Sequence, residues 1–211
     1  MTASRSATRG HRARPSFRVA ATAVAVALLT LTGPTMAAAP TPQSDRHCAV
    51  GLTQPAGGGL ATIVSETCFA TFAEAISFAT AGRAKVGPDF QPASLTADIV
   101  GVPRVAQAGE VAVVSRWTLG NDYKGLQLTG ESRTYFVDGI NPPCANGVVW
   151  EIDSLDAGWS NVIRSAQGWS GCNHFAHYDL ANQQGAFVVC LPTCLGMGAL
   201  DRKATSLRWW Q

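Results

Sequence analysis

The C-terminal stretch ALDRKATSLRWW gathers side chains that could do chemistry. It holds one carboxylate (Asp201), two cations (Arg202 and Lys203) and a Thr205-Ser206 pair directly before an aromatic segment. Hard divalent cations such as Ca²⁺ prefer carboxylate, carbonyl and hydroxyl oxygens as ligands. The stretch therefore fits either a divalent-metal loop or an ordinary solvated turn. A counterpart elsewhere in the chain would help to distinguish the two.

Six cysteines form the second set of reactive side chains. An even number of cysteines in an exported chain is most simply explained by disulfides. The first two stand alone in the N-terminal part, the last two enclose only Leu-Pro-Thr, and the middle two remain. Zinc ligation is the alternative, but the chain has no Cys-x-x-Cys. The predicted disulfides are Cys48–Cys68, Cys144–Cys172 and Cys190–Cys194.

Signals for catalysis are weak. His174 and His177 in NHFAHYD would form a metal-binding pair on a helix, but on a strand they point to opposite faces. The sequence GWSGC differs from the Gly-x-Ser-x-Gly elbow. No carboxylate pair and no nucleophile with a nearby base can be proposed from spacing. We therefore expect a non-enzymatic protein that requires no cofactor.

The N-terminus has the pattern of a secretory signal peptide. Five arginines precede an apolar run that starts at Val19 and is broken by Gly33-Pro34, before a membrane-spanning length of roughly 20 residues is reached. Ala37-Ala38-Ala39 then supplies a small-x-small cleavage pattern. We predict that residues 1–39 are removed near Ala39 and that the protein is secreted to the extracellular space. The alternative is a retained N-terminal membrane anchor.

Removal of this leader changes the charge balance. It takes away five of the 16 Lys and Arg residues, so that 11 remain against 14 Asp and Glu residues. A mildly acidic chain without a clustered basic face is not expected to bind nucleic acid. We also expect no membrane contact after cleavage, and a monomer.

Residues 40–85 show one clear helix signal. In TFAEAISFATAG, Thr71 is a natural N-cap and Glu74 completes a capping box, while Gly82 suits the C-terminal cap. The face of this helix would consist of Phe72, Ala75, Ile76 and Ala79, with Phe78 at its edge. We predict a small helical unit tied by a disulfide, or a pro-segment that is removed after export. Residues 86–109, which are rich in proline and lack periodicity, are predicted to be a linker with at most one short strand.

From about residue 110 the chain predicts an all-β sandwich. Short alternating segments rich in Val, Trp, Tyr and Thr are separated by Gly, Asn, Asp and Pro. In the last segment, Leu207 and Trp209 would face inward. The predicted strands are 112–118, 125–129, 133–137, 148–152, 162–168, 174–178, 186–190 and 204–210.

This region contains an internal repeat. YKGLQLTG (123–130) and YDLANQQG (178–185) each place an aromatic residue seven positions before a glycine. Downstream of each lies a second matched pair, LDAGWSNVIRS (155–165) and LGMGALDRKATS (195–206), which align with a one-residue insertion. The C-terminal stretch therefore has a counterpart, and the chain holds two copies of one supersecondary unit.

This unit resembles the Greek-key motif of the βγ-crystallin superfamily, and the resemblance covers residues 110–211. It assigns the aromatic corner and the positive-φ glycine to Tyr123 and Gly130 in the first copy and to Tyr178 and Gly185 in the second. The residue two before the glycine, where the family carries an aromatic, is not aromatic in either copy. The resemblance implies a two-motif Greek-key sandwich, preceded by the small helical unit.

The resemblance also implies two calcium sites. In calcium-binding members two such loops face each other, and each ion takes a carbonyl and a hydroxyl from one loop and a side-chain oxygen from the other. Here the first site would combine the Val162 carbonyl with Arg164 and Arg202, which offer two positive charges and no side-chain oxygen. We expect this first site to hold no ion.

The second implied site retains its oxygen atoms. It would combine the Lys203 carbonyl and the Thr205 hydroxyl with Asn161, and Asp201 would lie nearby. We expect at best weak Ca²⁺ binding, with a Kd of about 0.1–1 mM. The alternative is that both loops only close the Greek keys, through hydrogen bonds from their final serines to the hairpins.

A second function follows from the same resemblance, because secreted bacterial metalloproteinase inhibitors also use a two-motif βγ-crystallin domain. The predicted inhibitory loop is CLPTC, in which a disulfide would pin Leu191, Pro192 and Thr193 and present an apolar anchor to an extracellular protease. The alternative is that this disulfide only tightens a strand connection. Glycan or cell-wall binding is a further alternative, through Trp150, Trp159, Trp169, Trp209 and Trp210. We expect a protease-inhibitor-type or stability module.

Overall fold

Eleven strands and a few short helices make up the computed structural model, which describes residues 45–54, 58–100 and 114–211. The predicted signal peptide (1–39) and residues 101–109 of the predicted linker lie outside these described residues. All three described segments belong to one compact unit. Within them, no helix is long and apolar enough to cross a membrane. The mainly β architecture expected from the sequence is confirmed.

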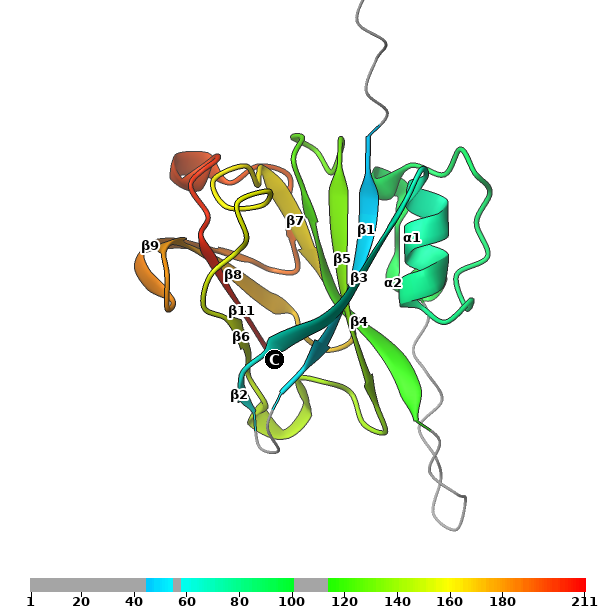
Figure 1. Cartoon of the computed structure of the whole chain (residues 1–211), viewed down its shortest axis with the longest axis horizontal. Helices are drawn as coiled ribbons and strands as arrows, with labels where there is room; N and C mark the ends of the chain where they lie inside the picture. Colours follow the sequence, from blue (N-terminus) through cyan, green and yellow to red (C-terminus); the bar gives the residue numbers. More distant parts are fainter. Residues whose placement is uncertain (1–44, 55–57, 101–113) are drawn as a thin grey trace, which may run out of the picture. The chain divides into compact units, whose positions relative to one another are not determined.

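The strands form two sheets that pack against each other (Figure 1). Sheet A has the strand order β10-β7-β4-β5-β1-β3, and sheet B has the order β2-β6-β11-β8-β9. The strands of sheet A are β1 His47–Thr53, β3 Thr62–Phe69, β4 Ser115–Tyr123, β5 Ser132–Gly139, β7 Ser165–Gly168 and β10 Thr193–Cys194. The strands of sheet B are β2 Gly59–Leu60, β6 Trp150–Ile152, β8 His174–Leu180, β9 Gln184–Cys190 and β11 Ser206–Trp210.

The two halves of the C-terminal region each give one strand to the other's sheet. β4 and β5 pair in sheet A, β6 crosses to sheet B beside β11, and β7 returns to sheet A beside β4. In the same way β8 and β9 pair in sheet B, β10 crosses to sheet A beside β7, and β11 returns to sheet B beside β8. The repeat found in the sequence is therefore a repeat of strand connectivity as well.

The main core lies between the two sheets. Trp209 is fully buried there, with ring centroids 4.6 Å from Phe175 and 5.0 Å from Tyr135. Leu207 is also fully buried, so the two side chains predicted to face inward from the last strand do so. Large aromatic side chains bury the most apolar area per residue, and here they join the sheets.

The N-terminal part corrects the prediction of a purely helical unit. β1 pairs in parallel with β5, and β3 pairs with β1 at the edge of sheet A. β1 was missed because six of its seven residues are buried, since both of its faces are covered. Such a strand shows no alternation of polar and apolar residues, and alternation is the pattern that identifies a half-buried strand. β3 brings Cys68 opposite Cys48.

The predicted helix is present as α1, Phe72–Ala79. Its capping box is formed: the Glu74 N–H donates to Thr71 Oγ1 (3.2 Å), and the Thr71 N–H donates to Glu74 Oε2 (3.1 Å). The predicted apolar face is buried, and Phe78 is 38 % exposed at its edge. Ala81 (φ 51°), rather than the predicted Gly82, directly follows the C-cap Thr80 as the left-handed residue; Gly82 (φ 76°) comes next, and its N–H donates to the Ser77 carbonyl (2.7 Å). Figure 1 shows α1 on the side of sheet A away from sheet B.

The described part of the predicted linker is packed. It contains a 3-10 turn, Pro92–Ser94, and the short helix α2, Ala97–Val100. Leu95 and Val100 are buried in a second core beneath α1, which also includes Phe72, Tyr123 and Trp169. This stretch therefore packs over sheet A. Its apolar residues are too widely spaced to show the periodicity of a helix or a strand.

Seven of the eight predicted strands overlap a strand of the structure, although β4 continues to Tyr123, beyond the predicted end at 118, and β10 was not predicted. Residues 125–129 form no strand, because Gln127 and Leu128 have positive φ values of 53° and 61° and fold the hairpin over. The predicted strand 162–168 begins only at Ser165. All three predicted disulfides are confirmed, with Cα–Cα distances of 3.9, 5.2 and 5.0 Å in chain order.

Candidate functional site

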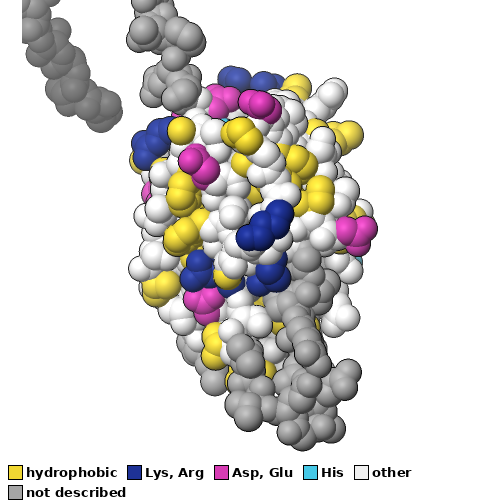
Figure 2. Space-filling model, turned by 90° about the vertical axis from the view of Figure 1, so that its right-hand side faces the viewer, with side chains coloured by type: hydrophobic (Ala, Val, Ile, Leu, Met, Phe, Trp, Pro, Cys, Tyr) yellow, Lys and Arg dark blue, Asp and Glu magenta, His cyan; other side chains and the backbone are white. Residues whose placement is uncertain are grey.

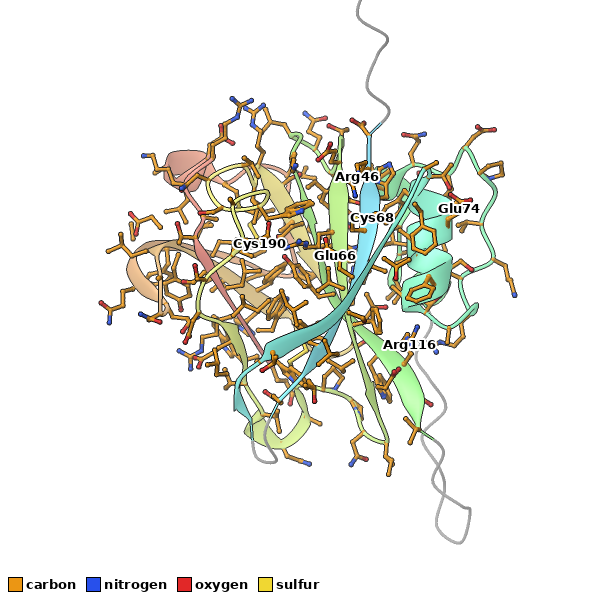
Figure 3. The ribbon with its side chains drawn as sticks, in the orientation of Figure 1. Arg46, Glu66, Cys68, Glu74, Arg116 and Cys190 are labelled. Atoms are coloured by element: carbon orange, nitrogen blue, oxygen red, sulfur yellow. A yellow bond between two sulfur atoms is a disulfide. The ribbon has the colours of Figure 1, made fainter. Side chains whose placement is uncertain are left out.

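The loop closed by the Cys190–Cys194 disulfide stands out from the sandwich surface. Cys190 is fully buried, whereas Leu191 is 64 % exposed and both Pro192 and Thr193 are exposed. Figure 3 labels Cys190, where the loop leaves β9. The ring is therefore buried at Cys190, its foot, and exposed at residues 191–193, its tip. The predicted anchor Leu191 is accessible to solvent.

Backbone hydrogen bonds hold both sides of this loop. In β10, Thr193 pairs with Gln167 of β7, and the Gly168 N–H donates to the Pro192 carbonyl at 2.8 Å. The disulfide connects the end of β9, in sheet B, to β10, in sheet A. A short loop fixed to two sheets loses little conformational freedom when a partner binds it.

Beside the loop, the folded hairpin of the first repeat supplies a further contact. The Gln127 N–H donates to the Leu195 carbonyl at 2.8 Å. Leu195 is 58 % exposed and Leu126, in the hairpin, is 44 % exposed. The backbone of Leu195 is thus fixed while its side chain remains accessible.

The loop also contributes to the wall of an apolar cavity of about 420 Å³. Its walls include Pro192 from the loop, the rings of Trp117 and Trp169, and Pro142. Trp117 is fully buried and Trp169 is 9 % exposed, so the cavity presents few exposed atoms of either ring.

The two repeat loops are closed by their final serines, as the second interpretation of these loops predicted. Ser165 Oγ donates to the Gly125 carbonyl (2.7 Å) and accepts from the Leu128 N–H (3.0 Å). Ser206 Oγ makes the matching pair with the Leu180 carbonyl (2.7 Å) and the Gln183 N–H (3.0 Å). Each serine therefore pins the folded hairpin of its own motif.

The two loops also bind each other. The Asn161 N–H donates to the Ala204 carbonyl (2.8 Å), and the Arg202 N–H donates to the Ile163 carbonyl (3.0 Å). Asn161 and Arg202 have positive φ values of 61° and 57°. The loops are therefore paired about a local two-fold relationship, as two facing sites would require.

An ion pair occupies one side of this loop pair. Arg164 Nε lies 3.0 Å from Asp201 Oδ1, and Arg164 Nη2 lies 3.1 Å from Asp201 Oδ2. The hydrogen bonds from Arg164 lower the pKa of Asp201, and burial opposes this shift without reversing it. Arg164 belongs to the site that we expect to hold no ion. Asp201 is therefore bound to a residue of that first site.

Two of the remaining oxygen ligands of the second implied site, Thr205 Oγ1 and the Lys203 carbonyl, lie close together. Asn161 Nδ2 donates to Ser160 Oγ (3.3 Å), and Thr205 Oγ1 lies 3.5 Å from the Lys203 carbonyl within its own loop. Without Asp201 the set has no carboxylate. The set therefore offers a carbonyl, a hydroxyl and an amide oxygen, which matches the weak Ca²⁺ binding expected at best from the sequence.

A charged pocket of about 500 Å³ was not predicted. Arg133 is 2 % exposed and lies 2.8 Å from Glu66 of β3 and 2.6 Å from Asp156. Its guanidinium carbon is 5.1 Å from the centroid of the Trp159 ring, and Lys124 Nζ is at the same distance from that centroid. No signal in the sequence brings β3, β5 and the 153–159 segment together. Glu66 and Cys68, which line this pocket, are labelled in Figure 3.

The same pocket contains one apparent metal-binding group. Among the residues that the structure describes, the one cluster of three such side chains is Cys48, Glu66 and Cys68, whose ligand atoms lie within 4.8 Å of one another. The two sulfur atoms are bonded to each other in a disulfide. They are therefore not available as thiolate ligands.

A groove of about 680 Å³ runs along α1 on the face shown in Figure 2. Its walls include Phe69, Phe78, Glu74 and Arg116, the last two of which are labelled in Figure 3. Arg116 is already engaged, because it forms an ion pair with Asp138 at 2.9 Å and lies over Phe78. On this face hydrophobic side chains are interspersed with separate basic and acidic ones (Figure 2).

The two histidines occupy different environments. His177 is fully buried between the sheets, where its Nε2 lies 2.7 Å from Asp122 Oδ1, and Tyr135 donates to Asp122 Oδ2 (3.1 Å). His174 is half-buried on the outer face of sheet B and stacks on Trp210 at 5.1 Å. The histidines thus lie on opposite faces of β8, as strand geometry predicts.

Tryptophans are mostly core residues here. Trp150, Trp159, Trp169 and Trp209 are between 0 and 9 % exposed, and only Trp210 of the five predicted glycan contacts is half-buried. The arrangement therefore offers a single partly accessible indole for stacking on a sugar.

Comparison with known proteins gives no relatives: no family model, no curated protein and no solved structure matches this chain.

Proposed function

We propose that this chain is a secreted βγ-crystallin-like module that inhibits an extracellular protease through the loop closed by Cys190 and Cys194. The observation that carries the proposal is the exposure of Leu191, 64 %, at the tip of a five-residue disulfide ring whose foot is buried and hydrogen-bonded. Exposed apolar side chains on a fixed backbone suit a partner with an apolar pocket.

The strand order supports the fold part of the proposal. There are two units of four strands, β4 to β7 and β8 to β11. In each unit the first, second and fourth strands lie in one sheet, and the third strand lies in the other sheet. Four antiparallel strands whose last strand returns beside the first have Greek-key connectivity. The positive φ values of Gly130 and Gly185, 76° and 79°, and the matching closures by Ser165 and Ser206 support the same assignment.

Three disulfides support the extracellular part of the proposal, because disulfides persist in oxidising compartments. Together with the apolar leader in the sequence, they favour export. The same bonds would keep the module folded where proteases are active.

Rigidity is the physical reason for inhibition. An inhibitor must fill the cleft without the large loss of freedom that a flexible peptide suffers on binding. Here the ring is fixed by the disulfide, by the pairing of Thr193 with Gln167 and by the bond from Gly168 to the Pro192 carbonyl. The loop has no charged residue, so an apolar specificity pocket fits it better than a basic or acidic one.

An inhibition assay tests the proposal. The secreted protein, titrated against thermolysin, is expected to inhibit it, and the Leu191→Asp variant is expected to lose about 10- to 100-fold in potency, because burial of a leucine side chain contributes about one to two factors of ten. Leu60→Asp, at a leucine 49 % exposed on β2, is the matched control and should keep full potency. Equal unfolding temperatures would show that the fold is intact. Absence of inhibition by the wild-type protein at about 10 µM would rule out this target class.

A further inference from the structure

Two more exposed leucines lie next to the disulfide loop. Leu191 and Leu195 each follow one of the bridged cysteines, whose Cα atoms are 5.0 Å apart. With 3.8 Å per peptide step, the Cα atoms of the two leucines are at most about 13 Å apart. A Cβ placed on Gly196 would lie 3.4 Å from Leu126 Cδ2, so the Leu126 side chain reaches the residue that follows Leu195.

These three side chains are exposed and lie in segments without charge. Leu191, Leu195 and Leu126 are 64, 58 and 44 % exposed. Neither the segment 190–200 nor the hairpin 125–130 contains a charged residue. Grouped exposed leucines without charges are unfavourable in water and typically mark a surface that a partner covers.

Hydrogen bonds fix the backbone around Leu195 and Leu126, as they fix the disulfide loop. The bond from the Gln127 N–H to the Leu195 carbonyl joins the hairpin to the segment after the disulfide. Ser165 in turn fixes the hairpin, because its hydroxyl bonds the Gly125 carbonyl and the Leu128 N–H. A partner that binds Leu191 therefore meets Leu195 and Leu126 in a fixed position, at little further entropy cost.

We infer that Leu195 and Leu126 form a second apolar contact with the protease that the loop engages. This inference rests on the proposed function and deepens it, because it specifies the class of partner. The protease must have an apolar specificity pocket for Leu191 and a further apolar surface beside it. Since the contact carries no charge, binding gains little from electrostatic steering and depends little on salt.

Single aspartate substitutions test the inference. Leu195→Asp and Leu126→Asp should each raise the inhibition constant for thermolysin by about 10-fold or more, for the same burial reason. Leu180→Asp is the matched control, because Leu180 is 55 % exposed in the hairpin of the second repeat, and its inhibition constant should stay within about twofold of wild type. Urea unfolding of each variant separates loss of contact from loss of fold. The wild-type constant should change by less than about threefold between 0.05 and 0.5 M salt.

The outcomes separate the two proposals. If Leu191→Asp abolishes inhibition while Leu195→Asp and Leu126→Asp inhibit like wild type, the second contact is wrong and the proposed function stands. If the wild-type protein inhibits no protease with an apolar pocket, both fail. A wild-type dimer in sedimentation experiments that Leu195→Asp dissociates would assign the surface to a second copy and overturn the inference, as would an equal loss in Leu180→Asp.

Discussion

Arg164 binds Asp201 through both carboxylate oxygens, at 3.0 and 3.1 Å, across the two paired repeat loops. The guanidinium therefore supplies the positive charge at the place where the resemblance to calcium-binding proteins would put an ion. A bidentate arginine–carboxylate pair also satisfies the directional hydrogen bonds of both partners. The chain thus closes this loop pair with its own cation.

Removal of the built-in cation should create a calcium site. The Arg164→Ser, Arg202→Asn double variant restores a hydroxyl and an amide oxygen, removes two positive charges and releases Asp201. Calorimetric titration should show one Ca²⁺ site more than in the wild type, with a Kd of about 0.1–1 mM. Adding Asp201→Asn to this variant should abolish the gain. Equal heats for the wild type and the double variant would contradict the prediction.

The two closing serines should contribute similarly to stability. Ser165→Ala leaves the Leu128 N–H without its partner, and Ser206→Ala does the same for Gln183. Each substitution should lower the free energy of unfolding by about 1–3 kcal/mol, measured by urea denaturation. Ser94→Ala, at an exposed position in the 3-10 turn, should change it by less than about 0.5 kcal/mol. A neutral effect at either serine would argue against equivalent hairpins.

His47 should make stability depend on pH. Burial lowers its pKa, against the weaker opposing charges of Asp45 and Glu131, so the unfolded chain binds more protons than the folded chain below about pH 6.5. Its contribution is therefore fully present above pH 6.5 and is lost as the pH falls below that value. His47→Gln, which can still bond to Ser132, should show a smaller drop in unfolding temperature between pH 7.5 and 5 than wild type. Parallel pH profiles would exclude this role.

The disulfides should differ in their access to reductant. Both cysteines of the Cys144–Cys172 pair are fully buried, whereas Cys194 is half-buried beside an exposed loop. Brief treatment with a dithiol, followed by alkylation and mass spectrometry, should label Cys190 and Cys194 before Cys144 and Cys172. Because the ring holds Leu191 in place, the protein labelled only at this pair should also inhibit thermolysin more weakly, by about tenfold. Simultaneous labelling of all six cysteines would contradict this order.

Local features of this chain were predictable from the sequence. These features depend on residues that are neighbours along the chain. They are the capping box of Thr71 and Glu74, the buried face of α1 and the positive φ of Gly130 and Gly185. The disulfide pairing also followed from spacing, because two of the pairs are close in sequence. Segments rich in Val, Trp, Tyr and Thr between turn residues predicted most strands of the C-terminal region, although β4, β5 and β7 are buried on both faces.

Contacts between distant segments were decided only by the tertiary structure. β1 was hidden in the sequence because burial of both of its faces removes the alternating pattern, and its parallel pairing with β5 joins residues more than 80 positions apart. The pairing of Arg164 with Asp201 and the burial of Arg133 between Glu66 and Asp156 likewise depend on loops that meet only after the sheets have formed. The sequence by itself determined the two repeats and their closing loops. The packing of the two sheets decided which charges meet in those loops and which leucines stay exposed beside the Cys190–Cys194 ring, because both depend on how the strands exchange between the sheets.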